Sequence, residues 1–95
     1  MAQLDVSIVT PEGPVFKGGA ESLVVPGSEG AFGVLPGHAP LIAAIREGSL
    51  TVRQTGSLRV FTVSSGFVQV LKDRVIVLAD RGRETASGEP LAAAH

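Results

Sequence analysis

The sequence predicts an all-β fold: a flattened antiparallel β-sandwich or barrel of about ten short strands, followed by a short irregular C-terminal tail. Twelve glycines and six prolines are dispersed along the 95 residues, so turns recur throughout the chain. Short apolar runs stand between these turns at spacings of about 8 to 12 residues, which is typical of sandwiches and barrels. No segment is long enough for a crossover helix, so the connections indicate an antiparallel meander of hairpins.

The first half of the chain alternates short strands with turns. Leu4, Val6 and Ile8 alternate with other residues in a half-buried strand that ends before Pro11. The segment 41–46 is ambiguous by periodicity, but Pro40 and Gly48 leave room for about two helical turns at most, so a strand is expected. The predicted strands of this half are 4–10, 15–17, 22–25, 32–35 and 41–46.

The second half predicts two hairpins, with strands at 50–54, 58–63, 66–71 and 75–79. The turns between the paired strands are residues 55–57 and 72–74. Residues 75–78 are apolar on both faces, which favours strands covered on both sides, as in a two-layer sandwich. Gly66 stands at the beginning of a strand, where a bulge or kink is expected.

The chain after residue 80 has a different composition. We expect residues 1–80 to form the β-sandwich domain and residues 81–95 to form a flexible, polar and alanine-rich tail. The run Leu91–Ala94 follows Pro90, and so short a run does not sustain a helix without packing.

Composition excludes several classes of function. A net charge of −1 provides no basic field for nucleic acid or an anionic membrane. The absence of cysteine excludes disulfides, thiolate nucleophiles and zinc ribbons, and two histidines cannot build a histidine-rich metal site. No apolar run approaches the roughly 18 residues of a membrane span, and the first ten residues do not resemble a signal peptide. The sequence therefore predicts a soluble protein that binds no cofactor and no metal.

The glycine-rich centre, residues 25–40, is the most informative stretch. Two Pro-Gly pairs, Pro26-Gly27 and Pro36-Gly37, each indicate a type II turn. The loop between them carries one large apolar residue, Phe32. The glycines match no phosphate-binding pattern and no helix follows them, so turn formation is the favoured interpretation.

The pattern of residues resembles the epsilon subunit of F-type ATP synthase. The run Val25–Pro40 carries the likeness, and matching segments follow in the same order at 46–50, 65–70 and 75–80. The opening Leu4-Asp5-Val6, with Pro11-Glu12-Gly13 after it, fits as well. The match covers residues 3 to 80, and it implies a ten-stranded sandwich.

The resemblance implies a non-catalytic rotor subunit of the central stalk. Such a subunit clamps gamma, rests on the ring of c subunits and couples proton translocation to ATP synthesis. The family's two-helix inhibitory domain is expected to be missing, and no nucleotide is expected to bind, because 78–83 mimics the nucleotide-binding pattern only loosely. A peripheral position at the cytoplasmic face of the bacterial inner membrane is also implied, without insertion.

The resemblance also implies two sets of partner-binding residues. Those expected to face the c-ring are Ser28, Glu29, Gly30, Ala31 and Phe32. Those expected to face gamma are Thr10, His38 and Ala43. Some relatives carry an acidic residue at the position of Ala31, a role that Glu29 could take here. Phe32 is either an anchor at the ring or an ordinary core residue.

Two other functions stay open from the residues alone. A free-standing β-sandwich binding module, for carbohydrate for example, normally presents exposed aromatic rings, and this chain has no Trp or Tyr. A small hydrolase would use His38 with Ser64 or Ser65 and Asp80, but nothing in the sequence places these residues together, and the G-x-S-x-G pattern is absent.

Overall fold

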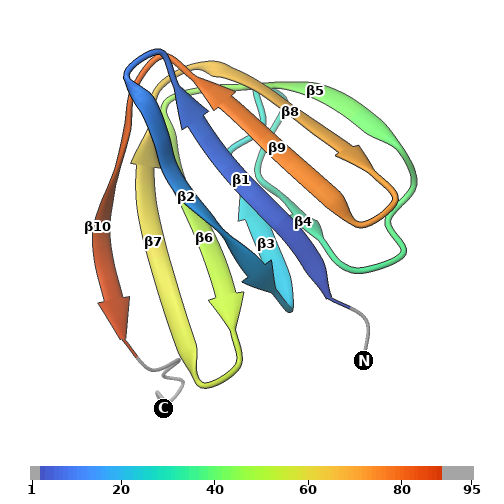
Figure 1. Ribbon diagram of the computed structural model, residues 1–95. Helices are drawn as coiled ribbons and strands as arrows, with labels where there is room; N and C mark the ends of the chain where they lie inside the picture. Colours follow the sequence, from blue (N-terminus) through green and yellow to red (C-terminus); the bar gives the residue numbers. More distant parts are fainter. Residues whose placement is uncertain (1–2, 89–95) are drawn as a thin grey trace.

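The computed structural model describes residues 3–88, which form ten strands in two five-stranded sheets (Figure 1). This confirms the all-β sandwich. The strands are β1 (Leu4–Thr10), β2 (Gly13–Ala20), β3 (Ser22–Val25), β4 (Phe32–Val34), β5 (Leu41–Ile45), β6 (Gly48–Gln54), β7 (Ser57–Val63), β8 (Gly66–Leu71), β9 (Arg74–Ala79) and β10 (Gly82–Gly88).

The strand order of the sheets is not that of a simple meander. The first sheet has the order β2-β1-β9-β8-β5, and the second has the order β10-β7-β6-β3-β4. The β1–β9 pair is parallel, whereas the other strand pairs of the described residues are antiparallel. The expectation of a purely antiparallel meander is therefore wrong. Strands β1 and β9 are far apart in the sequence, so no hairpin dictates their relative direction.

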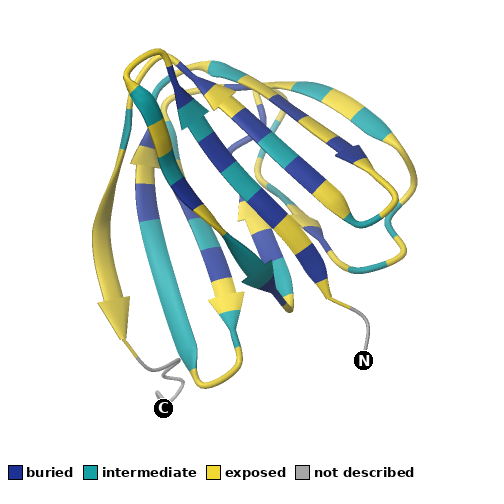
Figure 2. Cartoon of the chain, viewed as in Figure 1, coloured by how far each residue is buried: buried dark blue, intermediate teal, exposed yellow. Residues whose placement is uncertain are grey.

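The core lies between the two sheets and follows the alternation along each strand (Figure 2). In β1 the buried residues are Leu4, Val6, Ile8 and Thr10, with more exposed residues between them. The core is aliphatic apart from the rings of Phe16 and Phe61, whose centroids lie 5.3 Å apart. Burying one such aliphatic side chain contributes about 1.5–3 kcal/mol, so alternation alone supplies a strong reason for the two-layer arrangement.

Gly66 has a different role from the one that the sequence suggested. It pairs in regular register with Ala79, and the register shifts lie elsewhere, in β1 after Ile8 and in β10 after Glu84. A side chain at Gly66 would collide with the backbone carbonyl of Leu78. Glycine is needed here for the close approach of β9, and not for a bulge.

The polar segment after residue 80 is not an irregular tail throughout. Residues 82–88 form β10, which pairs with β7 at the edge of the second sheet. The backbone of β7 offers unpaired hydrogen-bonding groups on that side, and a strand can use them without contributing a core side chain. The expectation for Leu91–Ala94 lies outside the described residues.

Candidate interaction surfaces

The glycine-rich loop joins the two sheets at one corner of the sandwich. The amide of Ser28 donates to the carbonyl oxygen of Ala44 at 2.9 Å, and the amide of Arg46 donates to the carbonyl oxygen of Pro26 at 2.9 Å. Gly27 also forms an isolated bridge with Ile45. The loop after β3 is thus fixed to β5 of the other sheet by backbone bonds.

Only one of the two expected type II turns is present. At Pro36-Gly37 the φ of Gly37 is 88°, and the amide of His38 donates to the carbonyl oxygen of Leu35 at 3.0 Å, which confirms the turn. At Pro26-Gly27 the prediction is wrong. Gly27 instead accepts a hydrogen bond from the amide of Gly30, whose φ is 128°. A Cβ at Gly27 would lie 2.6 Å from the Gly30 carbonyl oxygen, so this turn closes only over glycine.

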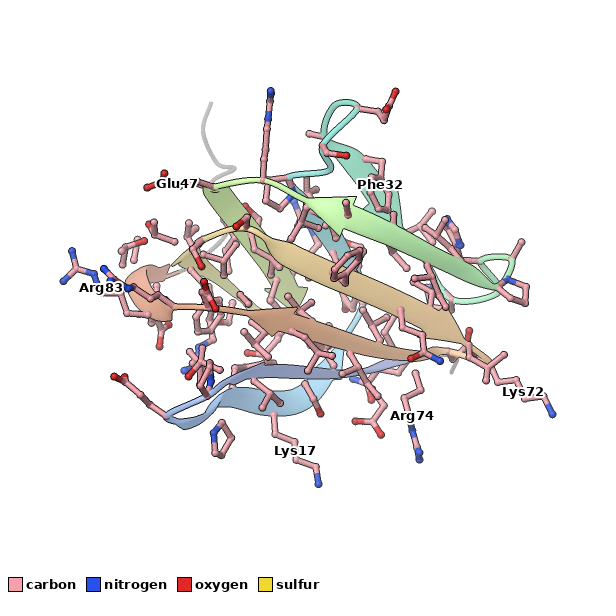
Figure 3. The ribbon with its side chains drawn as sticks, turned by 90° about the horizontal axis from the view of Figure 1, so that it is seen from above. Lys17, Phe32, Glu47, Lys72, Arg74 and Arg83 are labelled. Atoms are coloured by element: carbon pink, nitrogen blue, oxygen red, sulfur yellow. The ribbon has the colours of Figure 1, made fainter. Side chains whose placement is uncertain are left out.

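The residues expected at the c-ring lie mostly around one hollow at this corner. Ser28, Glu29, Gly30 and Phe32 line it, and Ala31 is exposed beside it. Phe32, labelled in Figure 3, is half-buried: its side chain packs against the core and also lines the hollow.

The residues expected at gamma come from three different segments, namely β1, the loop before β5, and β5. His38 lies in the loop before β5, where its Nδ1 is 2.6 Å from the carbonyl oxygen of Ala39. Ala43 lies within β5 and lines the same hollow as Phe32, although the two were assigned to different partners. Thr10 is buried, with 9% of its surface exposed, and its hydroxyl donates to the Gly13 carbonyl oxygen at 3.1 Å. It lines a groove with Ala44 at the far end of β5.

An exposed apolar surface on the first sheet was missed by the sequence analysis. Ile42 is 72% exposed, Phe67 58% and Leu78 53%. Cross-strand pairing places Phe67 between Ala44 of β5 and Leu78 of β9, and these three residues also line the groove at Thr10. We call Ile42, Ala44, Phe67 and Leu78 the apolar face. The prediction that residues 75–78 are covered on both sides is wrong, since one side of β9 faces solvent.

Charged residues lie on the part of the first sheet that is far from β5, on β2, β1 and the start of β9. Lys17 projects from β2 and Arg74 from β9, away from Phe32 (Figure 3). Arg74 lies beside Asp5, with 3.9 Å between its Nε and the Asp5 Oδ2. The first sheet is therefore apolar near β5 and polar near β2.

The residues that a hydrolase would need are not brought together in the structure. Ser64 is engaged with Arg81, whose amide donates to the Ser64 hydroxyl at 2.8 Å, and Ser65 lines the groove at Thr10. His38 lies in a separate hollow with Gly33 and Leu35. Within residues 3–88 no group of three or more potential metal ligands is found, and no helix is long and apolar enough to cross a membrane.

Fold and surfaces together define a class: a two-layer β-sandwich domain with exposed apolar side chains on its first sheet and no assembled catalytic site in the part that the structure describes. The chain belongs to the family of the ATP synthase delta/epsilon chain, whose beta-sandwich domain matches residues 3–84. The epsilon chain is a non-catalytic chain of ATP synthase, which confirms that the protein is not an enzyme by itself.

Curated relatives support the same family. The ATP synthase epsilon chain of Leptospira interrogans is 45% identical over 80 residues, which cover 84% of this chain and 63% of that one. The epsilon chain of Caulobacter vibrioides is 40% identical over 86 residues, covering 90% of this chain and 100% of that one. The chain thus spans less than two thirds of the Leptospira relative and matches the Caulobacter relative over its whole length.

Solved structures show the same fold. A chain in the mitochondrial ATP synthase of Euglena gracilis, a structure described as OSCP/F1/c-ring, gives a TM-score of 0.82 at 21% identity, covering 88% of this chain and 54% of that one. A chain from the central stalk and c-ring of the Tetrahymena thermophila enzyme gives 0.72 at 14% identity, covering 83% of this chain and 64% of that one.

Proposed function

We propose that the protein is a rotor subunit of the central stalk of F-type ATP synthase, linking gamma to the c-ring and thereby coupling proton translocation to ATP synthesis. Its family membership supports this, as does its likeness to chains from structures that contain a c-ring. The site of action is then the cytoplasmic face of the bacterial inner membrane, where the subunit is peripheral. The role requires no inhibitory helical domain, since the Caulobacter relative is matched over its whole length.

The observation that carries the proposal is the presence of two different surfaces on one stiff body. The hollow at the glycine-rich loop and the apolar face near β5 adjoin at Ala44 and are built on the same ten-stranded sandwich. A densely packed core resists deformation, so a force applied at one surface is transmitted to the other. This is what a mechanical connector needs, and it requires no catalytic group.

We assign gamma to the apolar face and its surroundings along β5. Exposed Ile42, Phe67 and Leu78 provide the apolar area that a stable protein interface buries at its centre. Ala43 lies in β5 and His38 in the loop before it, and Thr10 lines the groove while its hydroxyl bonds to the β1–β2 turn.

We assign the c-ring to the loop 28–32. Its backbone is fixed to β5, so Ser28, Glu29 and Ala31 are exposed on a rigid support. Glu29 supplies the negative charge for a basic residue of the ring, and Phe32 supplies the apolar contact at the rim of the hollow. No cofactor or nucleotide is part of this proposal.

The test is co-elution of the purified protein with the gamma subunit of the same organism on size exclusion. The unchanged protein is expected to form a stoichiometric complex, and Phe67→Ser is expected to weaken it at least about tenfold, the loss typical of an interface anchor. Val24→Ser is the matched control, because Val24 is also exposed but lies on the second sheet. Equal loss in both variants, or no complex with folded gamma, would refute the assignment.

The c-ring assignment has its own test. Glu29→Gln and Phe32→Ala are expected to reduce binding to the isolated c-ring while leaving the gamma complex intact. A Phe32→Ala protein that binds the ring and supports coupling normally would show that Phe32 is only a packing residue.

A further inference from the structure

Strand β10 differs from the other strands in that it contributes no buried side chain. Its residues are exposed, apart from Gly82, which is half-buried. It forms one edge of the second sheet, so it has a single neighbour, β7. Its attachment therefore depends on backbone hydrogen bonds and on contacts between polar side chains.

The backbone ladder of β10 is interrupted. Glu84 pairs with Phe61 and Ala86 pairs with Val60, so Thr85 is an extra residue on the β10 side. The Thr85 hydroxyl lies 3.4 Å from that of Thr62 and donates to the Val60 carbonyl oxygen at 3.3 Å. A bulge of this kind leaves one residue out of the regular pairing and weakens the ladder locally.

An ion pair adds to the backbone bonds between β10 and β7. The Arg59 Nε donates to Glu84 Oε2 at 2.8 Å, and its Nη2 donates to Glu84 Oε1 at 2.7 Å, a bidentate arrangement. The same guanidinium lies over the ring of Phe16, 4.9 Å from its centroid, and 5.8 Å from that of Phe61. Phe16 belongs to β2 and Phe61 to β7, so the Arg59–Glu84 pair covers the aromatic contact between the two sheets.

We propose that β10 is a displaceable closure of the sandwich, which detaches from β7 while the other nine strands stay folded. Detachment removes no side chain from the core, because β10 supplies none. The exposed ion pair between Arg59 and Glu84 contributes little to the free energy of attachment. Local opening of such a segment needs less free energy than global unfolding. This inference is independent of the assignments to gamma and the c-ring.

Opening would change the molecule in two ways at once. The edge of β7 would present unpaired amides and carbonyls, which can bind another strand. The Arg59 guanidinium over the rings of Phe16 and Phe61 would lose the Glu84 carboxylate that holds it in place. Strand β10, which lies beside β7 in Figure 1, would therefore open and close one edge of the second sheet.

Native-state hydrogen exchange on the full chain tests this directly. We expect the β10 amides bonded to β7 to exchange about 100-fold faster than the central amides of β8 and β9, because they open locally. If the two sets exchange at the same rate and with the same denaturant dependence, β10 opens only when the whole molecule unfolds, and the proposal is wrong.

Two variants test the cause. Glu84→Gln should accelerate exchange in β10 about fivefold without changing β8, since one charge-assisted pair is lost. Glu47→Gln is the control, because Glu47 is exposed and forms no ion pair among residues 3–88. An equal effect of both changes, or an equal effect on β8, would contradict the assigned role of Glu84.

A covalent lock provides the opposite test. The chain has no cysteine, so Thr62→Cys with Thr85→Cys introduces a single possible disulfide between two side chains that already touch. The oxidised protein should lose the fast exchange of β10, and reduction should restore it. Fast exchange that persists in the oxidised protein would show that the ladder does not open by strand detachment.

Discussion

At Gly66 the fold leaves no room for a single additional carbon atom. The backbone of β9 passes so close that a Cβ would collide with the Leu78 carbonyl and lie 2.8 Å from the Ala79 Cα. Both obstacles are backbone atoms, which cannot rotate away as a flexible side chain would. The same holds at Gly27, where the obstacle is the Gly30 carbonyl oxygen.

Gly66→Ala should therefore destabilise the protein by about 3 kcal/mol, the upper part of the range for overpacking. Denaturant unfolding followed by circular dichroism measures this. Gly88→Ala is the control, because nothing lies within 4 Å of a Cβ there, and its effect should be small. Equal stability of the Gly66→Ala protein would mean that β9 moves freely to make room.

Phe32 shows how one side chain can belong both to the core and to a surface. Its ring lies against Gly27, where a Cβ would be 2.9 Å from it, and it also lines the hollow at the loop. Phe32→Ala should cost about 2 kcal/mol in the free energy of unfolding, less than for a fully buried Phe. Phe61→Ala, at a fully buried position, should lower the free energy of unfolding by more. A larger loss in Phe32→Ala than in Phe61→Ala would show that Phe32 is mainly a core residue.

The β8–β9 hairpin positions the loop that carries His38. Its turn residues Lys72 and Asp73 have φ values of 52° and 64°, as a two-residue hairpin turn requires. Asp73 Oδ1 accepts a hydrogen bond from the Gly37 amide at 2.7 Å, and its carbonyl oxygen accepts one from the Asp5 amide at 2.8 Å. One turn residue thus connects β1 with the loop before β5.

Asp73→Ala should loosen the His38 loop without unfolding the sandwich. The Gly37 amide loses its carboxylate acceptor, so its hydrogen exchange should become about tenfold faster. Asp73→Asn, which retains an acceptor oxygen, should preserve most of the protection. If the alanine variant protects Gly37 equally well, the loop is held by the Pro36-Gly37 turn alone.

The attachment of β10 should depend on pH. The hydrogen bonds from Arg59 hold the pKa of the Glu84 carboxyl below its ordinary value of 4.5. A lowered pKa means that the ion pair stabilises the folded state fully above pH 4.5, and that this contribution disappears as the pH falls through the lowered value. NMR titration of the Glu84 carboxyl carbon and of the β10 amides should show both changing together. Glu84→Gln should abolish the transition in β10, and a transition that persists would assign it to another group.

Among residues 3–88 the sandwich has a well-covered interior and an uncovered apolar surface on its first sheet. Ile42, Phe67 and Leu78 are exposed, whereas their neighbours Val68 and Val77 are fully buried on the other side of the same strands. Exposed apolar patches of this kind mark surfaces that contact another protein. The alternation that builds the core therefore also defines the surface.

This asymmetry predicts opposite results for two changes of the same chemical kind. Ile42→Ser should change the free energy of unfolding by less than about 0.5 kcal/mol, since Ile42 is largely exposed. Val68→Ser should destabilise by about 3 kcal/mol, because it leaves a cavity and buries a hydroxyl. Thermal unfolding of both variants measures the contrast, and a large loss in Ile42→Ser would show that the apolar face is part of the packed core.

The sequence by itself determined the features that depend on near neighbours. Alternating apolar residues predicted the strands, and Pro36-Gly37 and the turn 72–74 predicted two of the reversals. The glycine-rich centre also carried the resemblance to the family that the comparisons show. The loop 28–32 could be singled out for the same reason, because its glycines and its one large apolar residue are visible in the chain.

Only the tertiary structure decided what depends on residues far apart in the sequence. The parallel pairing of β1 with β9, the addition of polar β10 to β7 and the exposure of Leu78 have no local signal. An apolar side chain has the same sequence pattern whether a second sheet, a partner or solvent lies above it. A polar strand can likewise be held by backbone bonds alone. Which face is covered is a property of the assembled sheets, because burial depends on the surface that the rest of the chain brings to it.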